Sequence, residues 1–284
     1  MSFDFKKSIS SLSVLSAMIS SCANPAAGVK PEAERFKTKF PDQIQKFRSQ
    51  SRTLQYAWSG DPKKQAILFV HGSPGSWEGW VHFLLDTNLS NNFHVISIDR
   101  PGYGGSGDGQ SEISLEQQAE DIFQVLKINL SKKPAILVGH SFGGPVIAKI
   151  AMLHPEHIGG LVFVASSVSP DLEKTKWIQT PATWWPIRDL IPNALRVCNE
   201  EILPLKGELI KMLPDWKKIT AKSVLIQGGQ DTLVPPENQE FLAEHLPNGS
   251  VLKVVRIEDL NHFVPWERPD LILDGILEFE KKKE

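Results

Sequence analysis

The sequence predicts an α/β fold in which helices cover both faces of a mostly parallel sheet. Three observations predict it: short apolar runs recur along the chain, most of them do not alternate with polar residues, and helical stretches separate most of them. Continuous apolar runs are typical of strands that are buried on both faces. The chain has 284 residues, which is long enough to bury a large hydrophobic core. Of these residues 41% are hydrophobic and 23% are charged, a composition that is ordinary for a globular protein.

The elements follow from turn signals and from hydrophobic periodicity. Strands are predicted over 53–58, 66–70, 95–98, 135–138, 161–165, 224–226 and 251–257. Apolar residues at helical spacing predict helices over 115–130, 145–153, 241–246 and 271–279. Before the first strand, residues 23–31 are predicted to form a tether and residues 32–50 one or two short helices, so that 23–52 precede the core.

The interval 171–222 contains no strand run and divides the core into two parts, 53–170 and 223–284. Insertions of this length usually form a lid or a binding element, and ligands of parallel sheets bind beyond the carboxyl ends of the strands. We therefore expect a short helical lid, cut into short helices by its prolines, with Trp177, Trp184 and Trp185 contacting substrate. The alternative is that these tryptophans only pack the lid on the body.

A candidate nucleophile lies between the strand at 135–138 and the helix that follows. Gly139-His140-Ser141-Phe142-Gly143 fits the pattern G-x-S-x-G, whose serine sits on a sharp turn between a strand and a helix. Glycines flank such a turn because a side chain there would clash with neighbouring backbone. We predict Ser141 as the nucleophile; an ordinary turn is the alternative.

A serine hydroxyl is a weak nucleophile unless a base removes its proton, and an acid must orient that base. His262, which follows the last predicted strand, is the predicted base. Asp231 follows the strand at 224–226 and is the predicted acid, because the chain order Ser, Asp, His matches that of G-x-S-x-G enzymes. Asp171 and Asp259 are the alternatives.

The developing oxyanion needs backbone N–H donors, one from the residue after the nucleophile and one from the loop after the first core strand. The predicted donors are the amides of Phe142 and Ser73. Pro74, which has no amide hydrogen, is excluded.

Taken together, these motifs resemble the α/β-hydrolase superfamily over about residues 53 to 280, and in particular its capped esterase, lactonase and epoxide-hydrolase-like branch. The matching segments are His71-Gly72-x-Pro74-Gly75, Asp99-Arg100-Pro101-Gly102-x-Gly104-x-Ser106, Gly139-His140-Ser141-x-Gly143-Gly144, Gly228-x-x-Asp231 and Asn261-His262.

The resemblance implies acyl-enzyme chemistry, because the epoxide hydrolases and haloalkane dehalogenases of that branch have aspartate where this chain has Ser141. The expected substrate is a carboxylic ester, thioester or lactone with an apolar part, and no cofactor is implied. Two alternatives stay open: an acyltransferase that uses the same triad, and a non-enzymatic surface lipoprotein that keeps the fold as a binding module.

The first 22 residues have the three parts of a secretory signal. Lys6 and Lys7 precede an uncharged, moderately apolar stretch at 9–21, and Cys22 follows two small residues. The boundary resembles the lipobox of bacterial lipoproteins. We therefore expect residues 1–22 to be a signal peptide, and Cys22 to be lipidated and to anchor an exported protein to a membrane. The alternative is the N-terminus of a cytoplasmic protein.

Charge and cysteine spacing argue against other classes of function. The formal net charge is −2 and no basic stripe is present, so a nucleic-acid partner is not expected. The two cysteines are far apart and no His-Glu-x-x-His occurs, so no metal site is expected. The sequence leaves the oligomeric state open.

Overall fold

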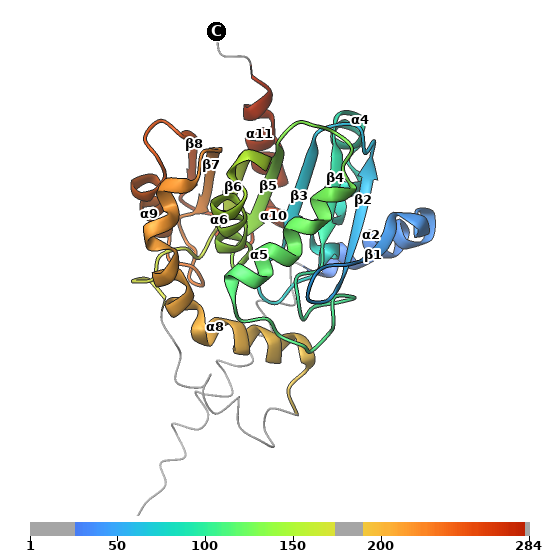
Figure 1. The fold of residues 1–284 in the computed structure, drawn as a ribbon, viewed down its shortest axis with the longest axis horizontal. Helices are drawn as coiled ribbons and strands as arrows, with labels where there is room; N and C mark the ends of the chain where they lie inside the picture. The colour runs from blue at the N-terminus through green and yellow to red at the C-terminus, as the bar shows by residue number, and fades with distance from the viewer. Residues whose placement is uncertain (1–25, 174–189, 282–284) are drawn as a thin grey trace, which may run out of the picture.

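The computed structural model describes residues 26–173 and 190–281, which form an eight-stranded sheet with helices on both faces (Figure 1). Its strands run in the order β1-β2-β4-β3-β5-β6-β7-β8. Their bounds are β1 (Ile44–Arg48), β2 (Thr53–Gly60), β3 (Ala66–Val70), β4 (His94–Ile98), β5 (Ala135–His140), β6 (Ile158–Val164), β7 (Lys222–Gly228) and β8 (Val251–Ile257). Only the β1–β2 and β2–β4 pairs are antiparallel, which confirms the prediction of a mostly parallel sheet.

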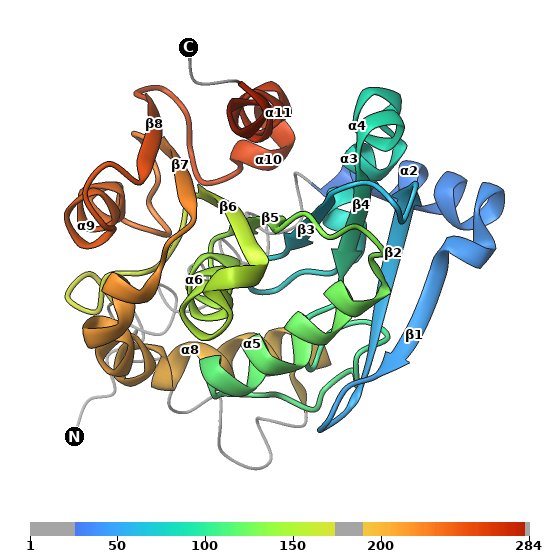
Figure 2. The ribbon, with the colours of Figure 1, turned by 45° about the horizontal axis from the view of Figure 1, so that its top comes forward.

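Helices cover the sheet in two groups (Figure 2). One group buries its apolar residues in the core on one face: α5 (Leu115–Phe123), α6 (Gly143–Leu153), α8 (Asn193–Met212) and α9 (Asn238–His245). The other group packs on the opposite face: α2 (Ala26–Lys39), α3 (Val81–Leu85), α4 (Thr87–Asn92), α10 (Val264–Glu267) and α11 (Pro269–Leu277).

Strand β3 shows why its sequence is continuously apolar. Leu68 and Val70 belong to the core on the first face, whereas Ile67 and Phe69 belong to the core on the second, and all four are fully buried. Successive side chains of a strand point to opposite faces, so a strand covered on both sides needs apolar residues at every position.

The segment before β2 differs from its prediction. Helix α2 begins at Ala26, inside the predicted tether, because Val29, Ala33 and Phe36 lie on one helical face and bury themselves in the core. Residues 44–48 were predicted as helix and form β1 instead, where the Phe47 ring contacts the Tyr56 ring of β2 at 5.8 Å between centroids. The conformation of this segment is determined by its pairing with β2, and local periodicity in the sequence does not reveal that pairing.

Helix α8 also differs from its prediction. The prolines of 171–222 were expected to cut that interval into short helices, yet α8 runs for 20 residues with Pro204 inside it. Leu205, Leu209 and Met212, which follow the proline, are buried in the core of the α5–α6 face, so tertiary packing outweighs the local penalty of the proline. Figure 1 shows α8 crossing one end of the sheet, beyond α5 and α6.

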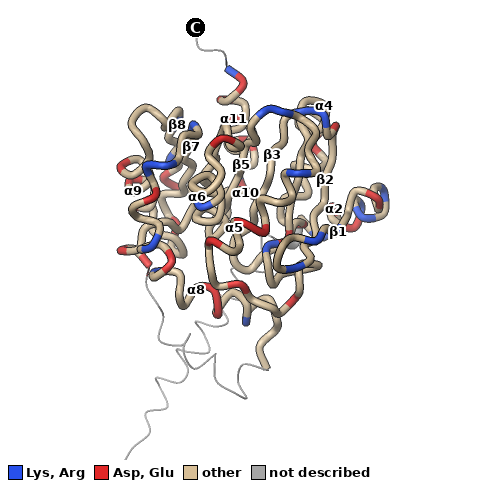
Figure 3. The backbone as a smooth tube through the Cα atoms, in the orientation of Figure 1, with Lys and Arg blue, Asp and Glu red and all other residues tan. Residues whose placement is uncertain are grey.

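The described surface carries both signs of charge (Figure 3). Lys37 and Lys39 lie in the last turn of α2, and Lys46 and Arg48 on the neighbouring edge strand β1. Among residues 26–173 and 190–281, no helix is long and apolar enough to cross a bilayer.

Candidate active site

Ser141 lies on the turn between β5 and α6, with a φ of +54° in the left-handed region. Its two flanking glycines are required by space. A Cβ at Gly139 would lie 2.5 Å from the Gly143 carbonyl oxygen, and one at Gly143 would lie 2.3 Å from the Val70 carbonyl oxygen. Both obstacles are backbone atoms, one at the start of α6 and one on β3, so the turn cannot accommodate alanine at either position without moving the backbone.

Asp231 and His262 meet at the carboxyl ends of β7 and β8. The carboxylate Oδ2 of Asp231 accepts a hydrogen bond from Nδ1 of His262 at 2.6 Å. Its Oδ1 accepts from the amides of Leu233 at 2.9 Å and Val234 at 2.8 Å. Asp231 and His262 are 5% and 6% exposed. The carboxylate is therefore oriented by its own loop, and it holds the imidazole with Nδ1 protonated and Nε2 available as a base.

His140 connects this pair to the serine turn. Its Nε2 donates to the His262 carbonyl oxygen at 3.0 Å, and the two rings lie 4.7 Å apart between centroids. Burial holds the pKa of His140 well below its usual range, so the ring is neutral and this nitrogen carries the hydrogen. The residue before Ser141 thus contacts His262 directly. No hydrogen bond joins the Ser141 hydroxyl to the His262 imidazole.

The two alternative acids lie elsewhere. Asp171 and Asp259 are exposed, and neither is hydrogen-bonded to His262 in the described part of the chain. Of the three carboxylates that the sequence offers for the position beside the imidazole, the structure places only Asp231 there.

The predicted oxyanion donors lie on the two loops that approach Ser141. Phe142 immediately precedes α6, and Ser73 follows β3. Among the described residues neither backbone N–H donates to another group, so both are available to a ligand. Gly72 is close to the serine, since a Cβ on Gly72 would lie 2.8 Å from the Ser141 Cβ.

A buried polar cluster behind Ser73 was not predicted. It joins Arg100, which follows β4, to Glu201 on α8, and both side chains are 0% exposed. Arg100 belongs to the motif that begins at Asp99, but nothing in the sequence connects it with a glutamate 101 positions later. Only the folded position of α8 brings the two together.

Burial sets the charge state of two further groups near the cluster. It lowers the pKa of His71 well below its usual range, and the neighbouring Arg100 charge acts in the same direction, so His71 is neutral. It raises the pKa of Asp99 to about 6, against hydrogen bonds from the Trp77 and Gly105 amides.

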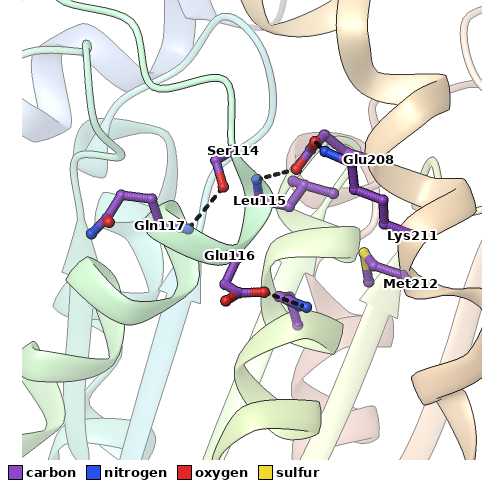
Figure 4. Close-up of a pocket in the computed structure, with 8 residues that line it drawn as sticks. Ser114, Leu115, Glu116, Gln117, Glu208, Lys211 and Met212 are labelled. Carbon is purple, nitrogen blue, oxygen red and sulfur yellow. Dashed lines mark hydrogen bonds and ion pairs between the residues drawn. The ribbon is translucent and has the colours of Figure 1, made fainter.

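Several predicted site residues lie outside the described residues: Trp177, Trp184, Trp185 and Cys22. The described part of the interval 171–222 includes α8, whose C-terminal half borders a hollow of about 210 Å³ between α5 and α6 (Figure 4). Ser141, Asp231 and His262 do not line that hollow. Within the described ranges, no group of three or more His, Cys, Asp or Glu side chains could hold a metal ion.

Comparisons with known proteins agree with this fold. A family model described as "Alpha/beta hydrolase family" matches residues 67–274. The uncharacterized hydrolase YugF of Bacillus subtilis is 26% identical over 275 residues, which cover 84% of this chain and 98% of YugF. The human monoacylglycerol lipase ABHD6 is 24% identical over 268 residues, covering 79% of this chain and 78% of the lipase.

Two further similarities differ in extent. The 1-acylglycerol-3-phosphate O-acyltransferase of Arabidopsis thaliana is 35% identical over 153 residues, which cover 50% of this chain and 36% of that protein. The crystal structure of a bacterial membrane phospholipase A superposes with a TM-score of 0.64 and 20% identity, covering 97% of this chain and 98% of that one. At that identity the superposition speaks for the fold alone.

Proposed function

Because the chain belongs to the alpha/beta hydrolase family, we propose that it is a serine hydrolase that forms an acyl-enzyme on Ser141. In this mechanism the imidazole of His262 takes the proton of the Ser141 hydroxyl as the oxygen attacks a carbonyl carbon. The acyl group transfers to the serine and the alcohol or thiol leaves with that proton. Water, activated by the same imidazole, then releases the acid.

The observation that carries the proposal is the hydrogen bond of 2.6 Å between Asp231 and His262. The backbone of His262 is in turn bonded to His140, the residue that precedes Ser141. A buried carboxylate fixes the tautomer of the base and stabilises the imidazolium that forms as the serine is deprotonated. The backbone N–H groups of Ser73 and Phe142, which donate to no other group among the described residues, are suited to donate hydrogen bonds to the oxyanion that develops on the carbonyl oxygen.

The substrate class we propose is a carboxylic ester, thioester or lactone with an apolar part. The similarity to a monoacylglycerol lipase supports an ester with an acyl chain. Trp177, Trp184 and Trp185 are proposed to contact that apolar part, since aromatic side chains bind apolar groups over a large area.

Acyl transfer is a second candidate, favoured by the similarity of half of this chain to an O-acyltransferase. The two reactions share the acyl-enzyme and differ in the acceptor that resolves it. Product analysis with an ester substrate and an added alcohol distinguishes them: hydrolysis yields the free acid, whereas a transferase yields a new ester in proportion to the alcohol.

Covalent labelling with a fluorophosphonate tests the proposed nucleophile. We expect intact mass spectrometry to show one adduct on the wild type and none on Ser141→Ala, because only a serine activated by a base reacts at an appreciable rate. The alanine variant should remain folded, since it keeps the Cβ and loses only the hydroxyl. A folded wild type without an adduct, or a Ser141→Ala variant that keeps it, would contradict the proposal.

The proposal includes an anchor at the N-terminus, where Cys22 follows a sequence with the three parts of a secretory signal. Lipidation at Cys22 would hold the enzyme at a membrane and close to acyl-chain substrates. We expect a radiolabelled or alkyne-bearing fatty acid to be incorporated in bacterial expression and to be lost in Cys22→Ala. The second cysteine provides the control, since Cys198→Ala should keep the label. Absence of label on the wild type would remove the anchor and leave the hydrolase unaffected.

A further inference from the structure

A buried ion pair joins α8 to Arg100 in the loop that follows β4. Arg100 donates from Nη1 to Oε2 of Glu201 at 2.9 Å and from Nη2 to Oε1 at 2.8 Å, so the contact is bidentate. Both side chains are fully buried. Glu201 also accepts hydrogen bonds from the hydroxyls of Tyr103, at 2.5 Å, and Ser73.

Such a pair is suited to fixing a geometry. Burying two charges costs more than an isolated contact returns, unless further hydrogen bonds satisfy both groups. Here each oxygen of Glu201 has at least two donors, and the guanidinium also binds Gln118 Oε1 at 2.8 Å. A fully satisfied buried network has one low-energy arrangement, so it holds its members rigidly.

The same guanidinium holds the backbone of the loop after β3. Its Nε donates to the His71 carbonyl oxygen at 2.8 Å, and its Nη2 approaches the Gly72 carbonyl oxygen at 3.1 Å. The Gly72 oxygen accepts a second hydrogen bond, from Nδ1 of His71 at 2.7 Å. Since Nε2 of that neutral ring accepts from the Arg100 amide at 2.9 Å, the tautomer is fixed and Nδ1 carries the hydrogen.

Fixing the Gly72 carbonyl also fixes the Ser73 N–H. The peptide between them is trans and planar, so its C=O and its N–H point in opposite directions. With the carbonyl directed at Arg100, the amide of Ser73 is directed away from the ion pair. A Cβ on Gly72 would lie 2.8 Å from the Ser141 Cβ, so the Gly72–Ser73 peptide is close to the proposed nucleophile.

We propose that Arg100 and Glu201 are positioning residues that aim the Ser73 amide at the oxyanion, and that α8 is thereby a structural part of the oxyanion hole. The proposal rests on the proposed function of Ser141 and adds to it a specific coupling. Neither side chain touches the reacting atoms; they act through the Gly72–Ser73 peptide. Displacing Glu201 would leave Arg100 without its counter-charge and allow that peptide to rotate.

The test compares Glu201→Gln and Arg100→Lys with the wild type. Glutamine keeps the shape of Glu201 but presents an NH₂ group to a guanidinium that has only donors, and lysine cannot span two carbonyls and a carboxylate. We expect kcat for ester hydrolysis to fall about 10- to 100-fold with KM within about twofold, because misaligning a donor affects the transition state more than the bound substrate.

A transition-state analogue supplies a readout that a purely structural role would not change. A trifluoromethyl ketone forms a tetrahedral adduct with an active serine and places its oxyanion in the same hole. Its affinity should fall by about the same factor as kcat in both variants. Affinity for the carboxylate product, which carries no tetrahedral oxyanion, should remain close to that of the wild type.

The matched control is Glu208→Gln. Glu208 lies two turns further along α8 and accepts from the Leu115 amide at 3.0 Å, so it also fastens α8 to the body but contacts neither Arg100 nor the loop after β3 (Figure 4). We expect this variant to keep the wild-type kcat and analogue affinity. If Glu201→Gln does not fold, Ser73→Ala replaces it. This variant removes the hydroxyl that contacts both Arg100 and Glu201 but keeps the backbone amide, so a smaller loss of kcat is expected.

The outcomes separate this proposal from the proposed function. Folded Glu201→Gln and Arg100→Lys with wild-type kcat and analogue affinity would overturn the positioning role, even if Ser141→Ala is inactive. A loss of kcat in Glu208→Gln equal to that in Glu201→Gln would also overturn it, because any loosening of α8 would then suffice. A wild type without turnover would overturn the proposed function, and this proposal with it.

Discussion

At the scale of single residues, the two carboxylate oxygens of Asp231 have different partners. Oδ1 accepts from the backbone amides of Leu233 and Val234, and Oδ2 accepts from His262 and, at 3.1 Å, from the Gln227 side chain. An oxygen is needed at Oδ1, because both of its partners are N–H donors. The carboxylate therefore cannot be replaced by an amide without placing the NH₂ group against the imidazole.

Asp231→Asn should consequently be a nearly inactive but folded variant. Its amide nitrogen would face Nδ1 of His262, which would shift the ring hydrogen to Nε2 and remove the lone pair that serves as the base. We expect kcat to fall about 10³- to 10⁴-fold with little change in KM. Steady-state kinetics on an activated ester measures this.

The controls are the other two candidate acids. Asp171→Asn and Asp259→Asn alter exposed carboxylates that are not hydrogen-bonded to His262 in the described structure, so both should keep the wild-type kcat. A large loss of activity in either of them, with Asp231→Asn active, would show that Asp231 is not the acid that orients His262.

Local motifs explain how far the site could be anticipated. The pairing of Asp231 with His262 follows from strand order, since each residue comes directly after a strand and parallel neighbours end at the same edge. Their catalytic roles stay a prediction. The contact between Arg100 and Glu201 could not be anticipated, because the position of α8 over the sheet is set by packing and not by any motif.

At the scale of elements, apolar runs located most strands. The predicted strands 66–70 and 251–257 match β3, inside the sheet, and β8, at one edge, in both bounds. The prediction was wrong for β1, an edge strand of five residues with Lys46 and Arg48 exposed, because a strand that is buried on one side only gives a weak signal. It was wrong also for Pro204, which was expected to end a helix. The proline lies inside α8, because burial of the turns that follow it outweighs its low helix propensity.

The N-terminus of α5 shows how α8 stabilises another helix. Ser114 caps α5 by accepting from the Gln117 amide at 3.2 Å, and Glu208 of α8 accepts from the Leu115 amide at 3.0 Å (Figure 4). Two N–H groups that the helix leaves free are thus satisfied by two different side chains, one of them a charge placed at the favourable end of the helix dipole.

Ser114→Ala and Glu208→Gln should therefore each lower the free energy of unfolding, by about 1 kcal/mol for the cap and about 0.5 to 1 kcal/mol for the charge. Urea denaturation of the single and double variants measures both. Since the two side chains satisfy different amides, the double variant should lose close to the sum. A neutral Ser114→Ala would indicate that water or another group replaces the cap.

At the scale of the whole molecule, three buried histidines and the half-buried His82 make stability depend on pH. Burial lowers the pKa of His82 and of His94 from 6.5 to about 4 in each case, and that of His71 and His140 well below the usual range. Below pH 6.5 the unfolded chain binds protons at these positions that the native state does not. The stability they contribute is present above pH 6.5 and is lost as the pH falls toward about 4.

We expect the free energy of unfolding to fall between pH 6.5 and pH 4, with each histidine contributing up to about 1.4 kcal/mol per pH unit. Urea denaturation over this range measures the slope. His94→Gln should reduce it, since glutamine does not titrate and can still contact Asn129, the partner of Nδ1 at 2.9 Å. An unchanged slope in His94→Gln would contradict the assignment.

Asp99 acts in the opposite sense and provides an internal check. Its pKa is raised from 3.8 to about 6, so the stability it contributes is present at low pH and is lost as the pH rises through about 6. Removing this group by Asp99→Asn should make the decline of stability below pH 6 steeper than in the wild type. A shallower decline would show that the carboxyl is ionised throughout.

The left-handed backbone conformation of Ser141 lowers the stability of the fold at a residue that the proposed activity requires. At a φ of +54° a residue with a Cβ is less stable than glycine by about 1 kcal/mol or more. Glycine would relax the turn but would remove the hydroxyl, so the most stable residue for this position is one that cannot attack a carbonyl. A chain that served only to bind would lose nothing by that exchange. The strained serine is thus a stability–activity compromise that a binding module has no reason to keep.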